Sequence, residues 1–191
     1  MTVRVVVAED ESIIRLDLRE SLEEEGYEVV GETARGDEAV ALVELLAPDV
    51  AILDIKMPGL DGIEAARRIH DRRTTAVLIL TAFSQRDLVE QARDAGAQAY
   101  LVKPFQRADL MPAVEMALAR HREAVALERQ VGDVTSRLEA RKSIDRAKGI
   151  LMDRHQMTEA DAFSFIQQAA MRTRATMADV AGQVLEGTLV P

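Results

Sequence analysis

The sequence lacks cysteine entirely, and no long hydrophobic run occurs among its 191 residues. Without cysteine the chain can form neither disulfide bonds nor thiolate metal sites, so nothing in it requires an oxidising compartment. No apolar stretch approaches the roughly 18 residues of a membrane-spanning helix. The first segment, MTVRVVVAEDES, holds too few apolar residues before its acids to resemble a secretion signal. We therefore expect a cytoplasmic protein that makes no membrane contact.

Positive charge is also scarce, but the deficit is confined to one part of the chain. Residues 1–120 contain 14 Lys and Arg against 23 Asp and Glu, a net charge of −9, whereas residues 121–191 contain ten of each. Within residues 136–174, eight basic residues outnumber five acidic ones, a net charge of +3. This asymmetry predicts two domains, 1–120 and 121–191, of which only the second has a basic segment suited to nucleic acid.

In residues 1–120, short β-branched runs alternate with amphipathic stretches, a pattern typical of a parallel sheet covered by helices on both faces. The predicted strands are Val3–Ala8, Glu28–Glu32, Val50–Leu53, Ala76–Leu80 and Ala99–Leu101. The predicted helices between them are Ser12–Glu25, Gly36–Leu46, Asp61–Arg72 and Gln85–Ala95. The predicted fold class is α/β, with a doubly wound, five-stranded parallel sheet.

A fifth helix is expected from about Arg107, and its end is not evident, because neither glycine nor proline occurs from Ala113 through Val131. Part of it follows the alternating spacing of three and four residues that marks a coiled-coil seam. The seam positions are Ala117, Arg120, Ala124, Leu127, Val131, Val134 and Leu138. Two explanations remain open: a dimeric coiled coil, or a helix that packs on its own C-terminal domain.

Polar side chains are predicted to gather at the carboxyl ends of the strands, where ligands bind in open α/β sheets. Glu9 and Asp10 follow the first strand, Asp54 follows the third, Thr81 ends the fourth and Lys103 follows the fifth. Three carboxylates in one crevice repel one another unless a divalent cation lies among them, and an oxygen-only set suits Mg²⁺. Asp54 is then the natural nucleophile toward a phosphoryl group, with Lys103 and Thr81 as partners for its oxygens. Each acid taken alone could be a solvated loop residue, but the joint arrangement argues for a site.

The segments VVVAEDE, LDIKMPGLDG, LTAF and YLVKPF resemble the signature segments of two-component receiver domains, from residue 3 to about residue 120. The resemblance implies a flavodoxin-like fold in a response regulator that a sensor histidine kinase phosphorylates on Asp54. It also implies Mg²⁺ bound by Asp10 and Asp54, with Glu9 acting partly through water and the backbone carbonyl of Lys56 as a further ligand. Such a protein is a phosphoacceptor in phosphorelay signal transduction and not an enzyme that acts on external substrates.

The same resemblance assigns Thr81 and Tyr100 to the family's switch pair, whose hydroxyl and ring move when the phosphoryl group is present. An aspartyl phosphatase is the enzymatic alternative, because it uses a similar sheet and Mg²⁺. Such phosphatases carry a second Asp two residues after the nucleophile, whereas this chain has Lys56 there. Turnover of external phosphate esters is therefore not expected.

Three further helical segments are predicted at Ser136–Arg154, Thr158–Met171 and Thr176–Leu185, and Thr158 and Thr176 stand at N-cap positions. The stretches AKGIL, TEADAF and AMRTR follow in this order and resemble the ANTAR family of RNA-binding antitermination domains over about Ala124–Leu189. The resemblance implies a small all-α three-helix domain, with its core at about 136–188. It also implies that this domain binds RNA hairpins in nascent transcripts.

Positive charge and hydrogen bonding would carry this binding, because aromatic side chains are scarce in the second part of the chain. Phe163 and Phe165 are its only phenyl rings, and Phe163 is expected in the core of the domain. The predicted RNA-binding residues are Arg141, Lys142, Arg146, Lys148, Gly149, Arg172 and Arg174. The alternative explanation of these charges is a solvated basic face.

Because the net charge of +3 is small, affinity for RNA should be modest, and a homodimer could present two copies to paired hairpins. Phosphorylation of Asp54 could favour this dimer. A DNA-binding helix-turn-helix output needs a basic second helix, but EADAFSFIQQAAM has no basic residue before Arg172. An output domain that contacts only protein is a further alternative.

Overall fold

The structure, a computed structural model, describes residues 2–82 and 86–191, without the side chains of residues 86, 133 and 134. Phe83 of the LTAF segment, Gln85 at the start of the predicted fourth helix, and the side chain of Val134 in the predicted seam therefore lie outside the described residues. The chain divides into two compact units, Met1–Ala126 and Leu127–Pro191.

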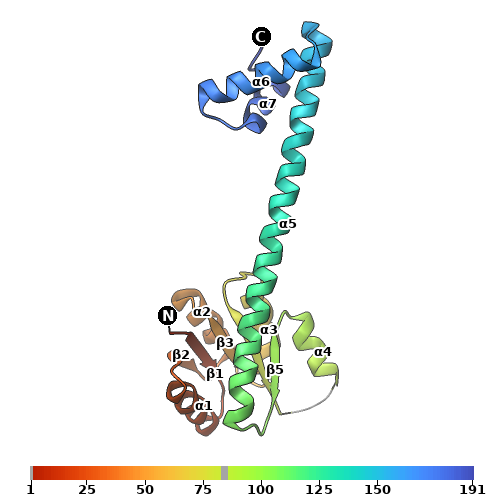
Figure 1. The fold of residues 1–191 in the computed structure, drawn as a ribbon. Coiled ribbons are helices and arrows are strands. Elements are labelled where there is room, and N and C mark those ends of the chain that lie inside the picture. Colours follow the sequence, from red (N-terminus) through yellow and green to blue (C-terminus); the bar gives the residue numbers. More distant parts are fainter. Residues whose placement is uncertain (1, 83–85) are drawn as a thin grey trace. The chain divides into compact units, whose positions relative to one another are not determined.

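The first unit contains a parallel sheet whose strands follow the order β2-β1-β3-β4-β5 (Figure 1). The strands are β1 (Arg4–Ala8), β2 (Glu28–Thr33), β3 (Val50–Asp54), β4 (Ala76–Thr81) and β5 (Ala99–Val102). The helices of this unit are α1 (Ser12–Glu24), α2 (Gly36–Leu46), α3 (Gly62–His70), α4 (Arg86–Asp94) and the first part of α5 (Arg107–His155). This strand order is that of the flavodoxin-like, doubly wound fold, so the predicted fold class is confirmed.

Two layers of apolar side chains cover the opposite faces of the sheet. Successive strand residues point to opposite faces, so Val5 and Val7 join one layer and Val6 and Ala8 join the other. Helices α1 and α5 cover the first layer, and α2, α3 and α4 cover the second. Strands β3 and β4 are buried along their whole length, which explains why their sequences are nearly continuous apolar runs.

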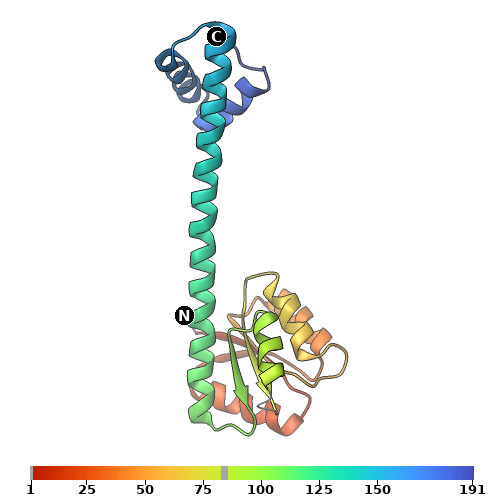
Figure 2. The same cartoon turned by 90° about the vertical axis from the view of Figure 1, so that its right-hand side faces the viewer.

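Helix α5 is longer than predicted, with 49 residues from Arg107 to His155 (Figure 2). The predicted helix Ser136–Arg154 is therefore not a separate element but the last part of α5. Gly132 lies inside the helix, and its cost of about 1 kcal/mol relative to alanine does not end it. Propagation adds one hydrogen bond for each residue, so a single weak position between good helix formers is tolerated. Neither α5 nor any other helix in the described part of the chain is long and apolar enough to cross a membrane.

The first turns of α5 are fixed to the first unit at two points. Arg107 pairs with Glu24 and Glu25 at the end of α1, with 2.7 Å between Arg107 Nη2 and Glu25 Oε1. Further along, the Arg120 guanidinium donates a hydrogen bond to the Gln98 carbonyl oxygen at 2.9 Å. Between these contacts, four α5 side chains are buried in the core of the unit. They are Leu110, Val114, Ala117 and Leu118.

The predicted coiled-coil seam passes through two environments. Ala117 is buried in the first unit, whereas Leu127, Val131 and Leu138 are 59%, 58% and 52% exposed. Apolar side chains repeated at this spacing and left exposed match the seam that a second helix would cover. Dimerisation stays a prediction.

The second unit is a helical core formed by the end of α5, α6 (Glu159–Thr173) and α7 (Met177–Leu185). Thr158 caps α6 by accepting a hydrogen bond from the Asp161 amide, and Thr176 forms a capping box with Asp179. Both predicted N-caps are confirmed. The buried side chains of this core are Ala147, Leu151, Ala162, Ile166, Ala169, Ala170, Val180, Ala181 and Val184.

The expectation that Phe163 lies in this core is wrong. Phe163 is 43% exposed, whereas Phe165 is partly buried and packs against the core. The buried side of α6 is centred on Ala162 and Ile166, and residue 163 falls at the margin of that side. Periodicity alone placed the ring on the wrong side of that margin.

Candidate functional site

Glu9, Asp54, Thr81 and Lys103 meet at the carboxyl edge of the sheet, as predicted from their places at the ends of the strands. Asp54 and Thr81 are the last residues of the neighbouring strands β3 and β4, and Thr81 pairs in register with Val102 at the end of β5. Glu9 directly follows β1. Four of the five strands, β1, β3, β4 and β5, thus deliver functional side chains to a common edge, because parallel strands end on the same side of the sheet.

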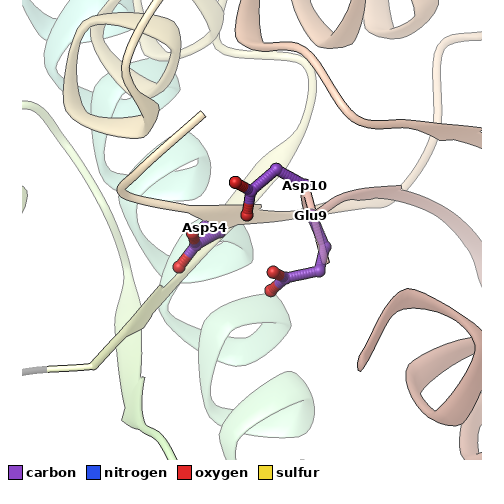
Figure 3. A group of neighbouring side chains, drawn as sticks. All are labelled: Glu9, Asp10 and Asp54. Carbon is purple, nitrogen blue, oxygen red and sulfur yellow. The ribbon is translucent and has the colours of Figure 1, made fainter. Parts of the chain in front are cut away.

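Three carboxylates share this edge, with one oxygen from each lying within 4.8 Å of the others. Figure 3 shows the side chains of Glu9, Asp10 and Asp54 directed toward a common space. Glu9 and Asp54 are buried, at 0% and 5% exposure, whereas Asp10 is exposed. Burial of two close carboxylates costs free energy unless positive charge compensates them.

Lys103 supplies part of that compensation. Its Nζ lies 2.5 Å from Glu9 Oε2 and 3.0 Å from Asp54 Oδ1, so one ammonium bridges both buried acids. Burial alone disfavours the ammonium, but its contacts with Glu9 and Asp54 outweigh that effect and raise the pKa of Lys103. The Lys103 amide donates a hydrogen bond to the Thr81 carbonyl oxygen at 2.7 Å, and the bond to Pro104 is cis.

Backbone amides hold the two buried carboxylates in place. The Glu11 amide donates to Glu9 Oε1 and the Lys56 amide donates to Asp54 Oδ2, both at 3.2 Å. Burial, the largest effect, and the nearby charge of Asp54 raise the pKa of Glu9, and the contact with Lys103 offsets them only in part. The charged form of Glu9 is therefore disfavoured at this position although Lys103 lies beside it.

The residues present fit a divalent cation. Glu9 Oε2 is buried, and the positive group beside it, the Lys103 ammonium, is shared with Asp54. Two buried carboxylates that share one ammonium are stabilised by a second cation nearby. All three candidate ligands are carboxylates, and oxygen ligands are those that Mg²⁺ prefers.

A cleft of about 160 Å³ opens beside the cluster and admits a small group to Asp54. Asp10, Thr81 and Lys103 line it together with Lys56 and Leu88. Leu88 was not singled out from the sequence, because an apolar residue on a helix carries no signal of a polar site. Tyr100 does not reach this cleft: it is 50% exposed on β5 and lines a separate hollow beside Arg120.

Gly62 is a residue of the site that sequence reasoning missed. A Cβ at this position would lie 1.9 Å from the carbonyl oxygen of Asp54. Because the first turn of α3 passes directly over the backbone of Asp54, only glycine fits there. The Asp-Gly pair at the end of the LDIKMPGLDG segment was the available signal, since glycine at a helix start permits close approach.

In the second unit, Lys148 is the most enclosed of the predicted RNA-binding residues that pair with acids. Its side chain is 16% exposed, and Nζ lies 3.0 Å from Asp145 Oδ1 and 2.8 Å from Glu159 Oε1. These two pairs raise the pKa of Lys148. Lys148 is therefore a cation that links α5 to the start of α6.

The other predicted RNA-binding side chains lie at the surface and do not form one uniform basic face. Arg141, with an 84% exposed side chain, lies 4.0 Å from Asp145, and Lys142 pairs with Glu139 at 2.9 Å. Within the described part of the chain no ion pair is found for the remaining three. They are Arg146, Arg172 and Arg174.

Gly149 lies on α5 in a position where a side chain would meet nothing. A Cβ built there has no other atom within 4 Å, so packing inside the unit does not require glycine. Glycine in a helix costs about 1 kcal/mol relative to alanine. The close approach that this glycine permits is therefore available only to something outside the unit.

Comparison with known proteins matches both units to families. The family model for the response regulator receiver domain matches residues 5–115, and the model for the ANTAR domain matches residues 132–185. The chain is 59% identical over 183 residues to the transcriptional regulatory protein PdtaR of Mycobacterium tuberculosis. The aligned region covers 96% of this chain and 89% of that protein.

The first unit also has more distant relatives. The chain is 36% identical over 112 residues to the chemotaxis protein CheY of Thermotoga maritima, and the aligned region covers 58% of this chain and 93% of that protein. Among solved structures, the signal receiver domain of the response regulator NarL from Mycobacterium tuberculosis matches with a TM-score of 0.60 and 34% identity. That match covers 62% of this chain and 97% of the other.

Proposed function

The chain belongs to the response regulators, joining a receiver domain to an ANTAR domain, and we propose that phosphorylation of Asp54 controls its binding of RNA. A sensor histidine kinase would supply the phosphoryl group. The observation that carries the proposal is the buried pair of carboxylates bridged by Lys103 beside an open cleft. A pair so costly to bury has a functional reason more often than a structural one.

The chemistry at Asp54 is transfer of a phosphoryl group from a phosphohistidine. A carboxylate oxygen of Asp54 forms a bond to phosphorus while the bond from phosphorus to the imidazole nitrogen breaks, and the imidazole leaves with the electron pair. Lys103 is then placed to pair with a phosphoryl oxygen, and the Thr81 hydroxyl to donate a hydrogen bond to another. The Lys56 amide, 3.2 Å from Asp54 Oδ2, holds the carboxylate in place.

Glu9, Asp10 and Asp54 would hold Mg²⁺, with the backbone carbonyl of Lys56 as a further ligand. When bound, the cation neutralises charge that develops on the phosphoryl oxygens. The cluster of three carboxylates, two of them buried and sharing one ammonium, supports this assignment. The chain's part in the reaction is confined to its own phosphorylation and dephosphorylation.

Phosphorylation would be communicated by Thr81 and Tyr100. Thr81 is buried and lines the cleft, so its hydroxyl can contact a phosphoryl group on Asp54. Tyr100 is half exposed on the adjacent strand, so a movement of its ring changes the surface of the unit. In the proposed switch, the Thr81 hydroxyl turns toward the phosphoryl group and the Tyr100 ring turns inward. The surface around β4 and β5 changes as a result.

The output would be binding of hairpins in nascent RNA, which regulates transcription antitermination. Arg141, Lys142, Arg146, Lys148, Gly149, Arg172 and Arg174 are the proposed contacts. A homodimer formed through the exposed seam of α5 would present two such surfaces, so that two modest affinities combine. Phosphorylation would act on this dimer.

Selection of bound RNA from a transcript pool tests the proposal. The full chain, treated with Mg²⁺ and acetyl phosphate, is compared with Asp54→Ala and with Asp71→Ala, an exposed acid at the end of α3. We expect wild type and Asp71→Ala to enrich hairpins to the same extent, and Asp54→Ala to differ. Equal recovery by all three would contradict control by Asp54, and preference for duplex DNA, or no nucleic acid at all, would contradict the RNA output.

A further inference from the structure

Phe163 is an aromatic side chain that the fold does not use. It is 43% exposed on α6, although Phe165, two residues on, packs against the core of the same unit. An exposed phenyl ring leaves apolar area in water and contributes little to stability. In a small helical unit with few large side chains, such a ring is available to a ligand.

The surroundings of Phe163 are polar and partly cationic. Glu159 lies one helical turn before it on the same side of α6, and Glu159 Oε1 holds Lys148 Nζ at 2.8 Å. Arg141 lies two turns before Lys148 on the same side of α5, with its side chain 84% exposed. Gln167 is exposed one turn after Phe163. The ring therefore lies one helical turn from the carboxylate that holds Lys148 of α5, with hydrogen-bonding side chains before and after it on α6.

We propose that Phe163 is the stacking platform for an unpaired base of the bound RNA, with Lys148 and Arg141 contacting the phosphates next to that base. The proposal rests on the RNA-binding function proposed above. An aromatic face next to basic side chains matches a nucleotide, which offers a flat ring and an anion on one unit. Bases within a duplex are already stacked, so only a base from a loop or bulge can reach the ring.

Glu159 adds a hydrogen-bond acceptor beside the ring. Its side chain is 70% exposed, and one carboxylate oxygen is engaged by Lys148, which leaves the other able to accept a hydrogen bond. The amino groups of adenine, cytosine and guanine donate such bonds, and so does the N3–H of uracil. Glu159 therefore helps to hold the stacked base without selecting among the four bases.

Hairpins with a fixed stem and a randomised loop, incubated with the full chain, provide the probe. The hairpin that wild type enriches is then measured against Phe163→Ala, Phe163→Tyr and Met171→Ala, the last replacing a 71% exposed side chain on the same helix. Loss of one base stack predicts about tenfold weaker binding by Phe163→Ala. Phe163→Tyr and Met171→Ala should bind like wild type, and all variants should melt alike.

A loop scanned with abasic nucleotides separates stacking from a structural role. Wild type should lose affinity at one loop position, and Phe163→Ala should lose nothing further there. Equal affinity of wild type and Phe163→Ala for the hairpin overturns this inference alone. A changed sedimentation mass for Phe163→Ala also overturns it, because the ring then belongs to a contact between copies. Failure of wild type to enrich any hairpin overturns the proposed function and this inference together.

Discussion

The site of the receiver unit buries two of its carboxylates, whereas most of the basic side chains proposed to bind RNA in the ANTAR unit are exposed. Glu9 and Asp54 are buried and share one ammonium, while Arg141 and Lys142 have side chains 84% and 59% exposed. The receiver site joins residues from four strand ends far apart in the sequence, and the ANTAR surface joins residues from two consecutive helices. Removal of one buried group should therefore abolish function, and removal of one exposed group should reduce it by degrees.

Replacement of Asp54 by asparagine should have the largest effect, which is complete loss of the acyl phosphate. Asparagine keeps the size of the side chain and its hydrogen bond with the Lys56 amide, but an amide is not a nucleophile toward phosphorus. Radiolabelled acetyl phosphate with Mg²⁺ provides the measurement. Asp71→Asn should label like wild type. Label that persists on Asp54→Asn would assign phosphorylation to another residue.

Substitution of a buried leucine by alanine in each unit tests whether the two hydrophobic cores unfold independently. Leu151→Ala, in the core of the ANTAR unit, should cost about 2–5 kcal/mol of free energy of unfolding. It should lower the unfolding temperature of that unit while labelling of Asp54 stays at the wild-type level. Leu78→Ala, in the receiver core, should impair labelling as well. Calorimetry with limited proteolysis resolves the units, and one shared transition for both variants would show a single cooperative core.

Tyr27→Phe should cost about 1 kcal/mol, because the phenol donates a 2.5 Å hydrogen bond to Glu115 of α5. Burial and the Glu115 carboxylate raise the pKa of Tyr27 from 10.0 to about 12. A raised pKa means that folding favours the neutral phenol, so the stabilisation is present below pH 10 and is lost as the pH rises through about 12.

Urea unfolding of wild type and Tyr27→Phe, at neutral pH and between pH 10 and 12, measures how the stabilisation by Tyr27 depends on pH. The difference in free energy should be constant at neutral pH and shrink in the alkaline range. Tyr100→Phe is the matched control, because Tyr100 is half exposed on the other side of the same unit. A difference that grows with pH would mean that the phenolate, not the phenol, is the stabilised form.

Gly149→Ala should change the free energy of unfolding least, and it should raise that free energy whereas Leu151→Ala and Tyr27→Phe lower it. Because a Cβ at this position meets no atom within 4 Å, alanine should stabilise α5 by about 0.5–1 kcal/mol. If RNA approaches the helix there, the same variant should bind hairpins more weakly. Gly182→Ala, another helical glycine with open space around it, serves as the control. A stabilised variant with unchanged binding would remove Gly149 from the proposed interface.

Sequence patterns predicted the receiver unit well because its constraints act jointly. Buried strands require continuous apolar runs, and parallel strands bring their carboxyl ends to one edge. The meeting of Glu9, Asp54 and Lys103 therefore followed from their positions at the ends of predicted strands. The functional roles of these residues remain predictions. Gly62 was missed because its requirement comes from the backbone of Asp54, which lies close only after folding.

The helical half was harder to predict, for two physical reasons. Helix continuity across Gly132 depends on small propensity differences, so a break and a continuous helix looked similar in the sequence. The side of α6 occupied by Phe163 depends on where α5 and α7 contact it, and periodicity does not resolve residues at the margin of a buried face. The pairing of Lys148 with Glu159 likewise requires the turn between two helices.

The two anchors of α5 in the receiver unit limit how this helix can move. Arg107 and Arg120 are fixed about 20 Å apart along the helix axis. These two exposed contacts are individually weak, but the four buried side chains between them pack into the core of the unit. Rotation of this stretch about its axis, or translation along it, would remove those side chains from the core and expose them to water. If phosphorylation of Asp54 acts through α5, it therefore does so without rotation or translation of this stretch while the core stays intact.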